Sequence, residues 1–571
     1  MKKYLKAGWL LLLFLAVEGY AQVEKQVEVT KAYVPSLERA EKLAVQPDMT
    51  DTMQLRPDID YTVTPLSLQT TLATRPMRPA EVTYWEFNRP KPFYVKAGVG
   101  YPLQSVADVY ASTQHPGTGY ALGYLHHTGR YADIKNDFGE KRSALRMENR
   151  IGGAAGKYLG KHLLEGDVNY THRAYRRYGD RYPEGWSSLK EGIGYSDVAA
   201  RVRFGDDFQD LTRTNFELAM DGTLFYDHSD WIDGQSRGRQ NEWGVRAHVG
   251  RALKKYRLDA SIGYRRMAGD KALDGCNEQL VEAALRYVRR IEQLSFEVGV
   301  DYCYDRIKQT ERKSEHYVFP YLHFEFDLLS DAVKPFIEVD GSLQHNDFRS
   351  LAAENPYLQR PLWLMQSTPE WEGRGGLTGH SKNHRFTYRA FLAYAYRDNN
   401  RYWLLPVLLD GGGPQIYEAG LRLHVEQQKR FTMGGEVEYR PTTAWLLDGA
   451  VRFYAYEDQH KLENGMPEWE ASVGVRYEGR KVHVALRAAM MGERYWSTVA
   501  AGEQQITEHT LRNRCYEAPS AMDVQLDFEW RISGMTALFI EGRNLLNADL
   551  YELPTMPEYG ISAMAGVRLT F

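Results

Sequence analysis

Gly560-Ile-Ser-Ala-Met-Ala-Gly-Val-Arg-Leu-Thr-Phe571 has the alternating pattern of a β-strand and ends on an aromatic residue. One face of this strand would carry the apolar residues Ile561, Ala563, Ala565, Val567 and Leu569. The other face would carry Ser562, Gly566, Arg568 and Thr570, with Met564 as the exception. A strand with one face suited to lipid and one suited to water, ending on Phe571, is what an outer-membrane β-barrel needs for closure. A soluble β-sandwich could contain the same strand, so the rest of the chain must decide.

The first residues have the pattern of an export signal. Lys2, Lys3 and Lys6 precede an apolar run over 9–17, and small residues follow at 19 and 21. This pattern predicts a secretory signal peptide over residues 1–21, cleaved before Gln22, and the alternative is an uncleaved N-terminal anchor.

Composition excludes several classes of protein. The 571 residues have a mean hydropathy of -0.53, and no apolar run after the signal approaches the roughly 20 residues of a membrane helix. Aromatic residues make up 13% of the chain, which fits the aromatic girdles of a barrel or, alternatively, a carbohydrate-binding β protein. A formal net charge of -4 gives no support for nucleic-acid binding. Three cysteines are too few for a disulfide scaffold, and we expect free thiols at Cys276 and Cys303, a disulfide between them being the alternative.

The sequence pattern of the chain changes near residue 93. Residues 22–92 contain eight prolines and little periodic pattern, which predicts an extended segment without a core of its own. We expect this segment to occupy or cap the periplasmic mouth of a barrel formed by 93–571, or alternatively to be a periplasmic tail.

From residue 93 onward the pattern is strand, turn, strand and loop. Residues alternate apolar and polar with period two over 164–173, 337–344, 417–426, 469–478 and 522–531. The apolar set, predicted to face lipid, includes Val168, Leu423 and Val473, and the polar set, predicted to face the lumen, includes His424 and Arg476. The polar face is heavily charged, so it lines water or forms an ionic network, and a stabilising lattice of ion pairs is the favoured interpretation.

The connections between these strands alternate in length. Short turns are expected near 156–161, 253–256, 290–294, 328–333, 478–481 and 532–535. Long loops are expected near 129–141, 175–190, 228–240, 304–316, 346–366, 397–415, 493–520 and 546–559. This asymmetry is typical of an outer-membrane barrel. We therefore predict an all-β protein, a transmembrane antiparallel barrel of about 22 strands (20–24); the count is ambiguous near 402–430, and a propeller or sandwich is the alternative.

No motif predicts catalysis, a cofactor or a metal. Asp137-Phe138-Gly139 lacks every other kinase element, and Gly152–Lys157 fails the spacing of a phosphate-binding loop. His126 and His127 point to opposite faces of a strand and cannot chelate one ion together.

Residues 541–571 resemble the C-terminal signature of TonB-dependent outer-membrane receptors. The residues that match the family pattern are Glu541, Asn544, Leu545, Asn547, Tyr551, Pro557, Gly560, Gly566 and Phe571. The resemblance implies a 22-stranded barrel, and Val27, Glu28, Val29 and Thr30 look like the TonB box of that family. Residues 22–92 are about half of what the family's plug needs, so the layout is similar to plug-less receptor-like barrels of the Bacteroidota type.

Two functions are compatible with these features. The first is a barrel for solute passage or uptake across the outer membrane, and the second is a membrane scaffold subunit of an assembly or secretion complex. An outer-membrane hydrolase is the weakest alternative, since no nucleophile motif occurs. Expected partners are outer-membrane lipid, the barrel-assembly machinery during insertion, and a lipoprotein or TonB, with no nucleic acid.

Overall fold

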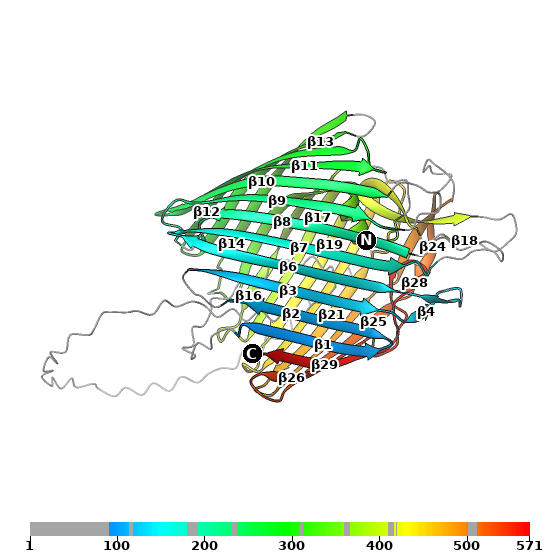
Figure 1. The fold of residues 1–571 in the computed structure, drawn as a ribbon. Helices are drawn as coiled ribbons and strands as arrows, with labels where there is room; N and C mark the ends of the chain where they lie inside the picture. Colours follow the sequence, from blue (N-terminus) through cyan, green and yellow to red (C-terminus); the bar gives the residue numbers. More distant parts are fainter. Residues whose placement is uncertain are drawn as a thin grey trace, which may run out of the picture. The chain divides into compact units, whose positions relative to one another are not determined.

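A computed structural model describes residues 91–113, 118–179, 192–208, 210–229, 237–308, 312–329, 331–358, 366–408, 416–417, 420–500 and 511–571. Within these residues, 22 antiparallel strands form one closed barrel (Figure 1), which confirms the predicted fold class and strand number. The first strand of the barrel, β1, begins at Phe93.

The barrel strands follow one another around the wall in chain order. They are β1 (Phe93–Tyr101), β2 (Gln104–Ser112), β3 (Gly119–Arg130), β6 (Arg146–Leu159), β7 (His162–Arg176), β8 (Gly192–Gly205), β9 (Asn215–Asp227), β10 (Gly238–Leu253), β11 (Tyr256–Lys271), β12 (Asn277–Ile291), β13 (Leu294–Lys308), β14 (Arg312–Phe326), β15 (Lys334–Gln344), β16 (Thr368–His380), β17 (Phe386–Leu408), β19 (Arg422–Tyr439), β20 (Trp445–Asp458), β21 (Trp469–Glu478), β22 (Val482–Met491), β25 (Ala521–Arg531), β26 (Thr536–Arg543) and β29 (Ser562–Thr570). The connections hold β4 (Asp133–Lys135), β5 (Lys141–Ser143), α2 (Phe348–Glu354), β18 (Ile416–Tyr417), β23 (Arg494–Ala500), β24 (Leu511–Ala518), β27 (Tyr551–Leu553) and β28 (Met556–Pro557).

The terminal strand closes the barrel. β29 pairs with β26 on one side and with β1 on the other, in a register that joins Tyr94 to Thr570 and Tyr101 to Ala563. Phe571 exchanges backbone hydrogen bonds with Phe93, and their rings stack with centroids 5.5 Å apart. Because every strand then has two neighbours, the barrel exposes no free sheet edge at its closure.

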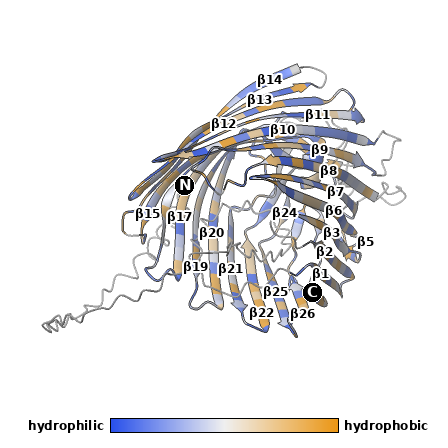
Figure 2. Cartoon of the chain, turned by 60° about the vertical axis from the view of Figure 1, so that its left-hand side comes forward, coloured by the Kyte–Doolittle hydropathy of each residue, from blue (hydrophilic) through white to orange (hydrophobic). Residues whose placement is uncertain are grey.

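The outer face of the wall is apolar. Apolar and hydrophilic residues alternate along the strands (Figure 2), and Val168, Ile262, Leu392 and Val473 are each more than half exposed. Aromatic pairs border this apolar band at both ends, for example Trp445 with Tyr477 near the short turns and Trp243 with Tyr264 near the long loops. An apolar band between two aromatic girdles fits a barrel that spans a membrane.

The inner face carries ion pairs that bridge the strands of the wall. We call this set of inward-facing pairs the lumen lattice. Arg430 on β19 lies 3.3 Å from Glu370 and 2.9 Å from Glu372 on β16. Glu370 also pairs with Arg397 on β17 at 2.9 Å. The geometry supports the stabilising role favoured from the sequence, because these charges have partners of opposite sign within the wall.

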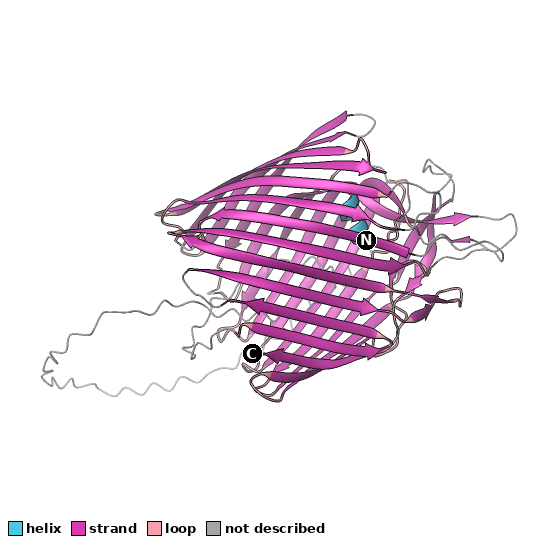
Figure 3. Ribbon diagram, viewed as in Figure 1, coloured by secondary structure: helices cyan, strands magenta, loops and turns pink. Residues whose placement is uncertain are grey.

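The connections at the two ends of the barrel differ in length, as predicted. Short turns such as Gly160–Lys161 and 254–255 lie at one end, the turn end, and connections with their own secondary structure lie at the other, the loop end. By the usual rule for bacterial barrels, the turn end faces the periplasm and the loop end the exterior. Among the described residues, no helix is long and apolar enough to cross a membrane; α2 is the short helix drawn in Figure 3.

Two predicted loops are wrong. Residues 304–308 and 312–316 belong to β13 and β14, so only a short connection lies between these strands. Residues 397–408 continue β17, with a register irregularity between Arg397 and Asn400. Past this irregularity the face that each β17 residue presents is shifted by one position, so the alternation of the sequence no longer marks one continuous strand. The predicted strand count was therefore ambiguous in this region.

One seam of the wall is closed by side chains. β14 pairs with β15 only over Leu322–Glu325, although both strands extend beyond that stretch. Beyond it, the indole nitrogen of Trp371 donates a hydrogen bond to the carbonyl oxygen of Val318 at 3.0 Å. The buried ring of Phe319 packs directly against β15 at Gly341, where a Cβ atom would lie 2.3 Å from the ring. Glycine is therefore required at position 341 by close approach.

Candidate functional site

Residues 345–358, the described first part of the connection between β15 and β16, fold over the loop end of the barrel. Their helix, α2, begins after Asp347, whose side chain accepts a hydrogen bond from the backbone N–H of Ser350 at 2.8 Å. This is a standard helix N-cap. Phe348 then packs edge-on against the inward-facing rings of Tyr195 and Phe225, with centroids 6.1 and 5.3 Å away.

The other end of α2 contacts the opposite part of the wall. The Trp403 indole nitrogen on β17 donates to Glu354 at 2.6 Å, and Arg401 pairs with the same carboxylate at 2.6 Å. Leu358 forms a β-bridge with Leu421. The connection therefore links β8 and β9 to β17 and β19 across the mouth of the barrel.

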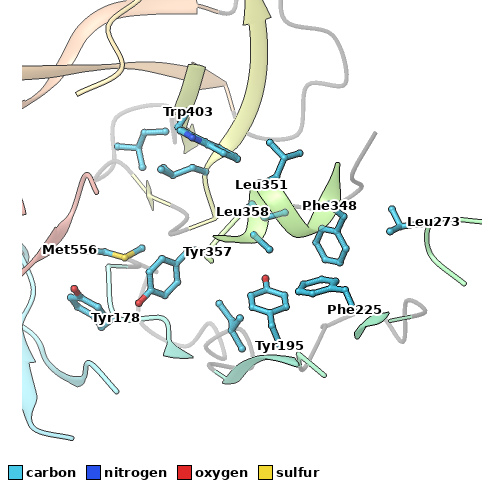
Figure 4. Packing of buried hydrophobic residues seen from close by; sticks show 14 of the residues in the cluster. Tyr178, Tyr195, Phe225, Leu273, Phe348, Leu351, Tyr357, Leu358, Trp403 and Met556 are labelled. Carbon is cyan, nitrogen blue, oxygen red and sulfur yellow. The ribbon is translucent and has the colours of Figure 1, made fainter. Parts of the chain in front are cut away.

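The side chains around α2 form a true hydrophobic core, which we call the cap core (Figure 4). Its buried members are Ala144, Tyr178, Ile193, Tyr195, Phe225, Leu273, Cys276, Phe348, Leu351, Ala352, Tyr357, Leu358, Trp403, Leu405, Val407, Leu421 and Met556. Burying each large apolar side chain contributes about 1.5–3 kcal/mol. The loop end is thus held by hydrophobic packing, whereas the lumen below it is polar.

The cap core corrects one facing assignment. Leu423, predicted to face lipid, packs against the cap core instead. β19 and β17 continue past the aromatic girdle at this point, so the face that meets lipid lower down meets protein here. His424, on the other face, lies 3.6 Å from Glu426, which also pairs with His460 of the connection between β20 and β21.

A small, open cavity of about 40 Å³ lies beside the cap core. Its walls are the ends of β3, β6 and β7, the end of α2 and the segment from β27 to Tyr559. The lining residues are Arg130, Ile134, Ala144, Arg146, Tyr175, Tyr178, Ala353, Glu354, Pro356, Tyr357, Glu552, Leu553, Met556, Glu558 and Tyr559. This cavity is the candidate functional site.

Charges in the cavity are paired across the loops. Arg146 donates to Glu552 at 2.7 Å, and Arg130 donates to Glu558 at 2.7 Å. Both ion pairs are partly exposed, with between a quarter and three fifths of each side chain open to solvent. A solute with hydrogen-bonding groups can exchange with such pairs at small cost, since exposed ion pairs contribute about 0–1 kcal/mol.

Tyrosine rings form the apolar part of the cavity wall. Tyr357 lies edge-on to Tyr175 and Tyr178, with centroids 6.1 and 6.5 Å away. Burial raises the pKa of both Tyr178 and Tyr357 well above the ordinary tyrosine value. Both hydroxyls are therefore neutral at physiological pH, and the rings offer flat apolar surfaces beside charged rims.

Asp137 joins three loops near this cavity. Its carboxylate accepts hydrogen bonds from the hydroxyls of Tyr516 and of Tyr551, the latter at 2.8 Å. The residue lies in the turn between β4 and β5, while Tyr516 belongs to β24 and Tyr551 to β27. The Asp137-Phe138-Gly139 stretch is thus part of a loop anchor.

The residues that resemble the receptor signature lie near the closure of the barrel. Buried Asn544, at φ 48°, donates its side-chain amide to the carbonyls of Ala548 and Tyr559 at 2.8 and 3.1 Å. Asn547 accepts from the backbone of Ile561 at 3.0 Å, so Gly560 is needed beside it, where a Cβ atom would lie 2.3 Å from the Asn547 side chain.

The other signature residues also have local partners. Glu541 pairs with Lys96 of β1 at 2.7 Å, and the backbone N–H of Leu545 donates to Val524. The carbonyl of Pro557 accepts from Tyr178, and Gly566 packs against the carbonyl of Ala97. These contacts shape the last connection and hold β29 in place.

The remaining candidate residues are not brought together at a site. Val27, Glu28, Val29 and Thr30 lie outside the described residues. His126 contacts Asp108, while His127 contacts Ser105 at 2.8 Å, on the other face of β3. Cys276 and Cys303 form no disulfide with each other, as expected. In the part of the chain that the structure describes, no group of three or more His, Cys, Asp or Glu side chains is arranged to hold a metal ion.

Sequence reasoning missed both the cap core and the cavity. Their residues come from at least six connections and strand ends, none of which has a period that would mark it as buried. The available signal was the concentration of Tyr, Phe and Leu in segments that were too aromatic for solvent loops, such as 348–358.

The comparisons support the fold. No family model matches the sequence, and no curated protein does. The FrpB iron transporter from Neisseria meningitidis is 10% identical, with a TM-score of 0.63 over 85% of this chain and 82% of that chain. The ferripyoverdine receptor of the Pseudomonas aeruginosa outer membrane is 10% identical, with a TM-score of 0.62 over 85% and 72%. The copper transporter OprC is 12% identical, with a TM-score of 0.59 over 85% and 82%. The chain therefore has the barrel fold of outer-membrane receptors and transporters of this kind.

Proposed function

We propose that this protein takes up a solute across the outer membrane, that the cavity beside the cap core receives the solute, and that the cap gates its passage. The observation that supports this most is the position of the cavity. It lies at the loop end, between loops, above a wall whose inner face is polar. The barrel fold shared with the receptors and transporters described above agrees with this role.

The cavity favours a polar solute that also has a flat or apolar face. Arg130, Arg146, Glu552 and Glu558 offer hydrogen-bond donors and acceptors in two opposed pairs. Tyr175, Tyr178 and Tyr357 supply the apolar wall. The proposal gives this chain binding and passage, and assigns it no reaction.

Passage requires the cap to move. The connection that carries α2 is anchored on both sides of the mouth, through Phe348 on one side and Glu354 on the other. Energy from the inner membrane through a TonB-like partner at Val27–Thr30 would supply the force for such a movement. Insertion of the barrel would use the assembly machinery, which acts on the closing strand.

Two measurements test the proposal. The first is the thermal shift of the purified barrel with a panel of neutral sugars, dipeptides and iron chelates. A solute that stabilises the native protein should lose most of its effect in the Arg130→Gln/Arg146→Gln double variant. Arg251→Gln, an exposed position at the turn end, is the matched control and should leave the shift unchanged.

The second measurement is swelling of liposomes that contain the protein, with the same solutes outside. Faster entry of the stabilising solute supports uptake. If no solute binds or enters while the protein co-purifies with a stoichiometric envelope partner in mild detergent, the proposal fails and the scaffold function replaces it.

A further inference from the structure

The outer face of β11–β14 carries basic residues directly above the aromatic girdle at the loop end. Trp243 pairs in register with Arg266, Arg266 with Gln279, and Gln279 with Arg306. These residues therefore form one row of paired residues across the strands, which we call a rung, on one face of the wall. This face is the lipid-facing one, because Ile262 and Val300, at the same parity as Arg266 and Arg306, are among the exposed apolar residues.

The next rung toward the turn end lies at the boundary between lipid and water. It joins Tyr264, Val281, Tyr304 and His316 in register. The rings of Trp243 and Tyr264 are 5.3 Å apart, and those of Tyr304 and His316 are 4.9 Å apart. Since aromatic girdles lie at the level of the lipid headgroups, Arg266 and Arg306 are placed at the headgroups of the outer leaflet.

These arginines have no acidic partner among the described residues. The carboxylates at this level point inward: Glu242 pairs with Arg265 at 3.1 Å, and Glu278 pairs with His345 at 2.8 Å. The outward acid on these strands, Asp270, lies two rungs nearer the loops and accepts the backbone N–H of Lys271. Exposed Lys308 adds a further positive charge one rung above Arg306.

An outward-facing lysine on β19, four strands along the wall from β14, differs in this respect. At the rung of Tyr396 on β17, Lys429 on β19 is paired with Glu457 on β20 at 3.0 Å. The positive charge there is neutralised within the protein. On β11–β14 it is left for a partner outside the protein.

We propose that Arg266 and Arg306, with Lys308, bind the phosphate-bearing headgroup of an outer-leaflet lipid whose acyl chains lie along the apolar band below. Arg266 and Arg306 are separated by two strand spacings, about 10 Å, so they can contact different oxygens or different phosphates of one headgroup. Guanidinium groups suit phosphate because they donate paired hydrogen bonds. The partner is a membrane lipid because the apolar band and the aromatic girdle continue directly below the cluster. This inference is independent of which solute passes through the barrel.

Native mass spectrometry of the purified barrel with added bisphosphorylated lipid A tests the proposal. We expect lipid A to bind the wild-type protein, and the Arg266→Gln/Arg306→Gln double variant to bind it at least fivefold more weakly. Lys429→Gln, an outward-facing position on β19 whose charge is already paired with Glu457, is the matched control and should bind like the wild type. Heat-modifiable gel migration should show that all three proteins are folded barrels.

Two further measurements distinguish a lipid phosphate from a free phosphate ion as the ligand. Dephosphorylated lipid A should bind wild type and double variant equally weakly, and inorganic phosphate at the same concentration should not displace bisphosphorylated lipid A. Equal binding of bisphosphorylated lipid A by wild type and double variant overturns the proposal. Displacement by inorganic phosphate also overturns it, since the site would then recognise a free anion.

Discussion

The wall of the barrel and the cap at its loop end place their apolar residues in opposite ways. In the wall, Val168, Leu392 and Val473 face outward, and charged pairs such as Arg430 with Glu372 face inward. In the cap, Phe348, Leu351 and Leu358 are buried within the protein. The wall uses lipid as its apolar solvent, whereas the cap stands in water and needs a core of its own. The same residue types therefore stabilise the two regions by different means.

The largest expected effect is on the wall. Deleting residues 562–571 removes β29, which pairs with both β26 and β1, and leaves two unpaired strands in the membrane. We expect no closed barrel to form, measured as loss of the heat-modifiable band. The cap variant Leu351→Ala is the control and should keep that band; a truncated protein that migrates as folded would show that closure does not depend on β29.

The second prediction compares one substitution in each region. Val473→Arg places a charge on the lipid face, at a cost of about 2–4 kcal/mol if the position is near the midplane. Leu423→Arg places the same charge against the cap core and should release the loops with little effect on the wall. Urea unfolding in lipid vesicles measures the first effect and protease cleavage of the loops the second. Arg476→Ser, on the lumen face, should have a smaller effect than either substitution in the corresponding assay. A larger effect of Arg476→Ser would refute the assignment of these residues to the two faces.

The third prediction isolates the cap. Leu351 is fully buried on α2, so Leu351→Ala should cost the cap about 2–5 kcal/mol. We expect faster proteolysis between β15 and β16 and larger conductance steps in planar bilayers. Unchanged unfolding of the wall in urea would separate the two regions; a cap that stays protected would mean that the cap core does not hold the mouth.

The fourth prediction compares two adjacent residues on opposite faces. Arg430 points inward and contacts Glu370 and Glu372, whereas Lys429 points outward and pairs with exposed Glu457. Arg430→Ala should lower the free energy of unfolding by about 1.5–3 kcal/mol, because it removes hydrogen bonds between charged groups. Lys429→Ala should leave the free energy of unfolding nearly unchanged, because an exposed ion pair contributes little. Equal effects in urea would show that the lumen lattice is as weak as a surface ion pair.

The smallest effect concerns pH. Burial raises the pKa of Tyr178 and Tyr357 above the ordinary value of 10. The stability that these residues give the cap is complete below pH 10 and is lost as the pH rises further, because the unfolded cap then releases its protons first. Loop proteolysis should therefore be faster at pH 11 than at pH 8, and less so in Tyr178→Phe. The same rate at both values would mean that the hydroxyls are not buried.

The wall could be predicted from the sequence because a strand in a membrane has a simple rule. Alternation over 164–173 and 469–478 assigned Val168 and Val473 to lipid, and both are exposed on the outer face. The rule failed where strands leave the membrane. Beyond the irregularity at Arg397, the same period continues, but Leu423 contacts protein instead of lipid.

The sequence by itself determined the class of fold, the approximate number of strands, the closing role of the last strand and the face of most wall residues. Those properties depend on period two and on the identity of neighbours in the chain, which a sequence records directly. Only the tertiary structure decided that 397–408 is strand, that Phe348, Tyr357 and Trp403 form one core, and that Arg130 and Arg146 share a cavity. Those contacts join loops that lie hundreds of residues apart, and closing the barrel is what brings the loops together.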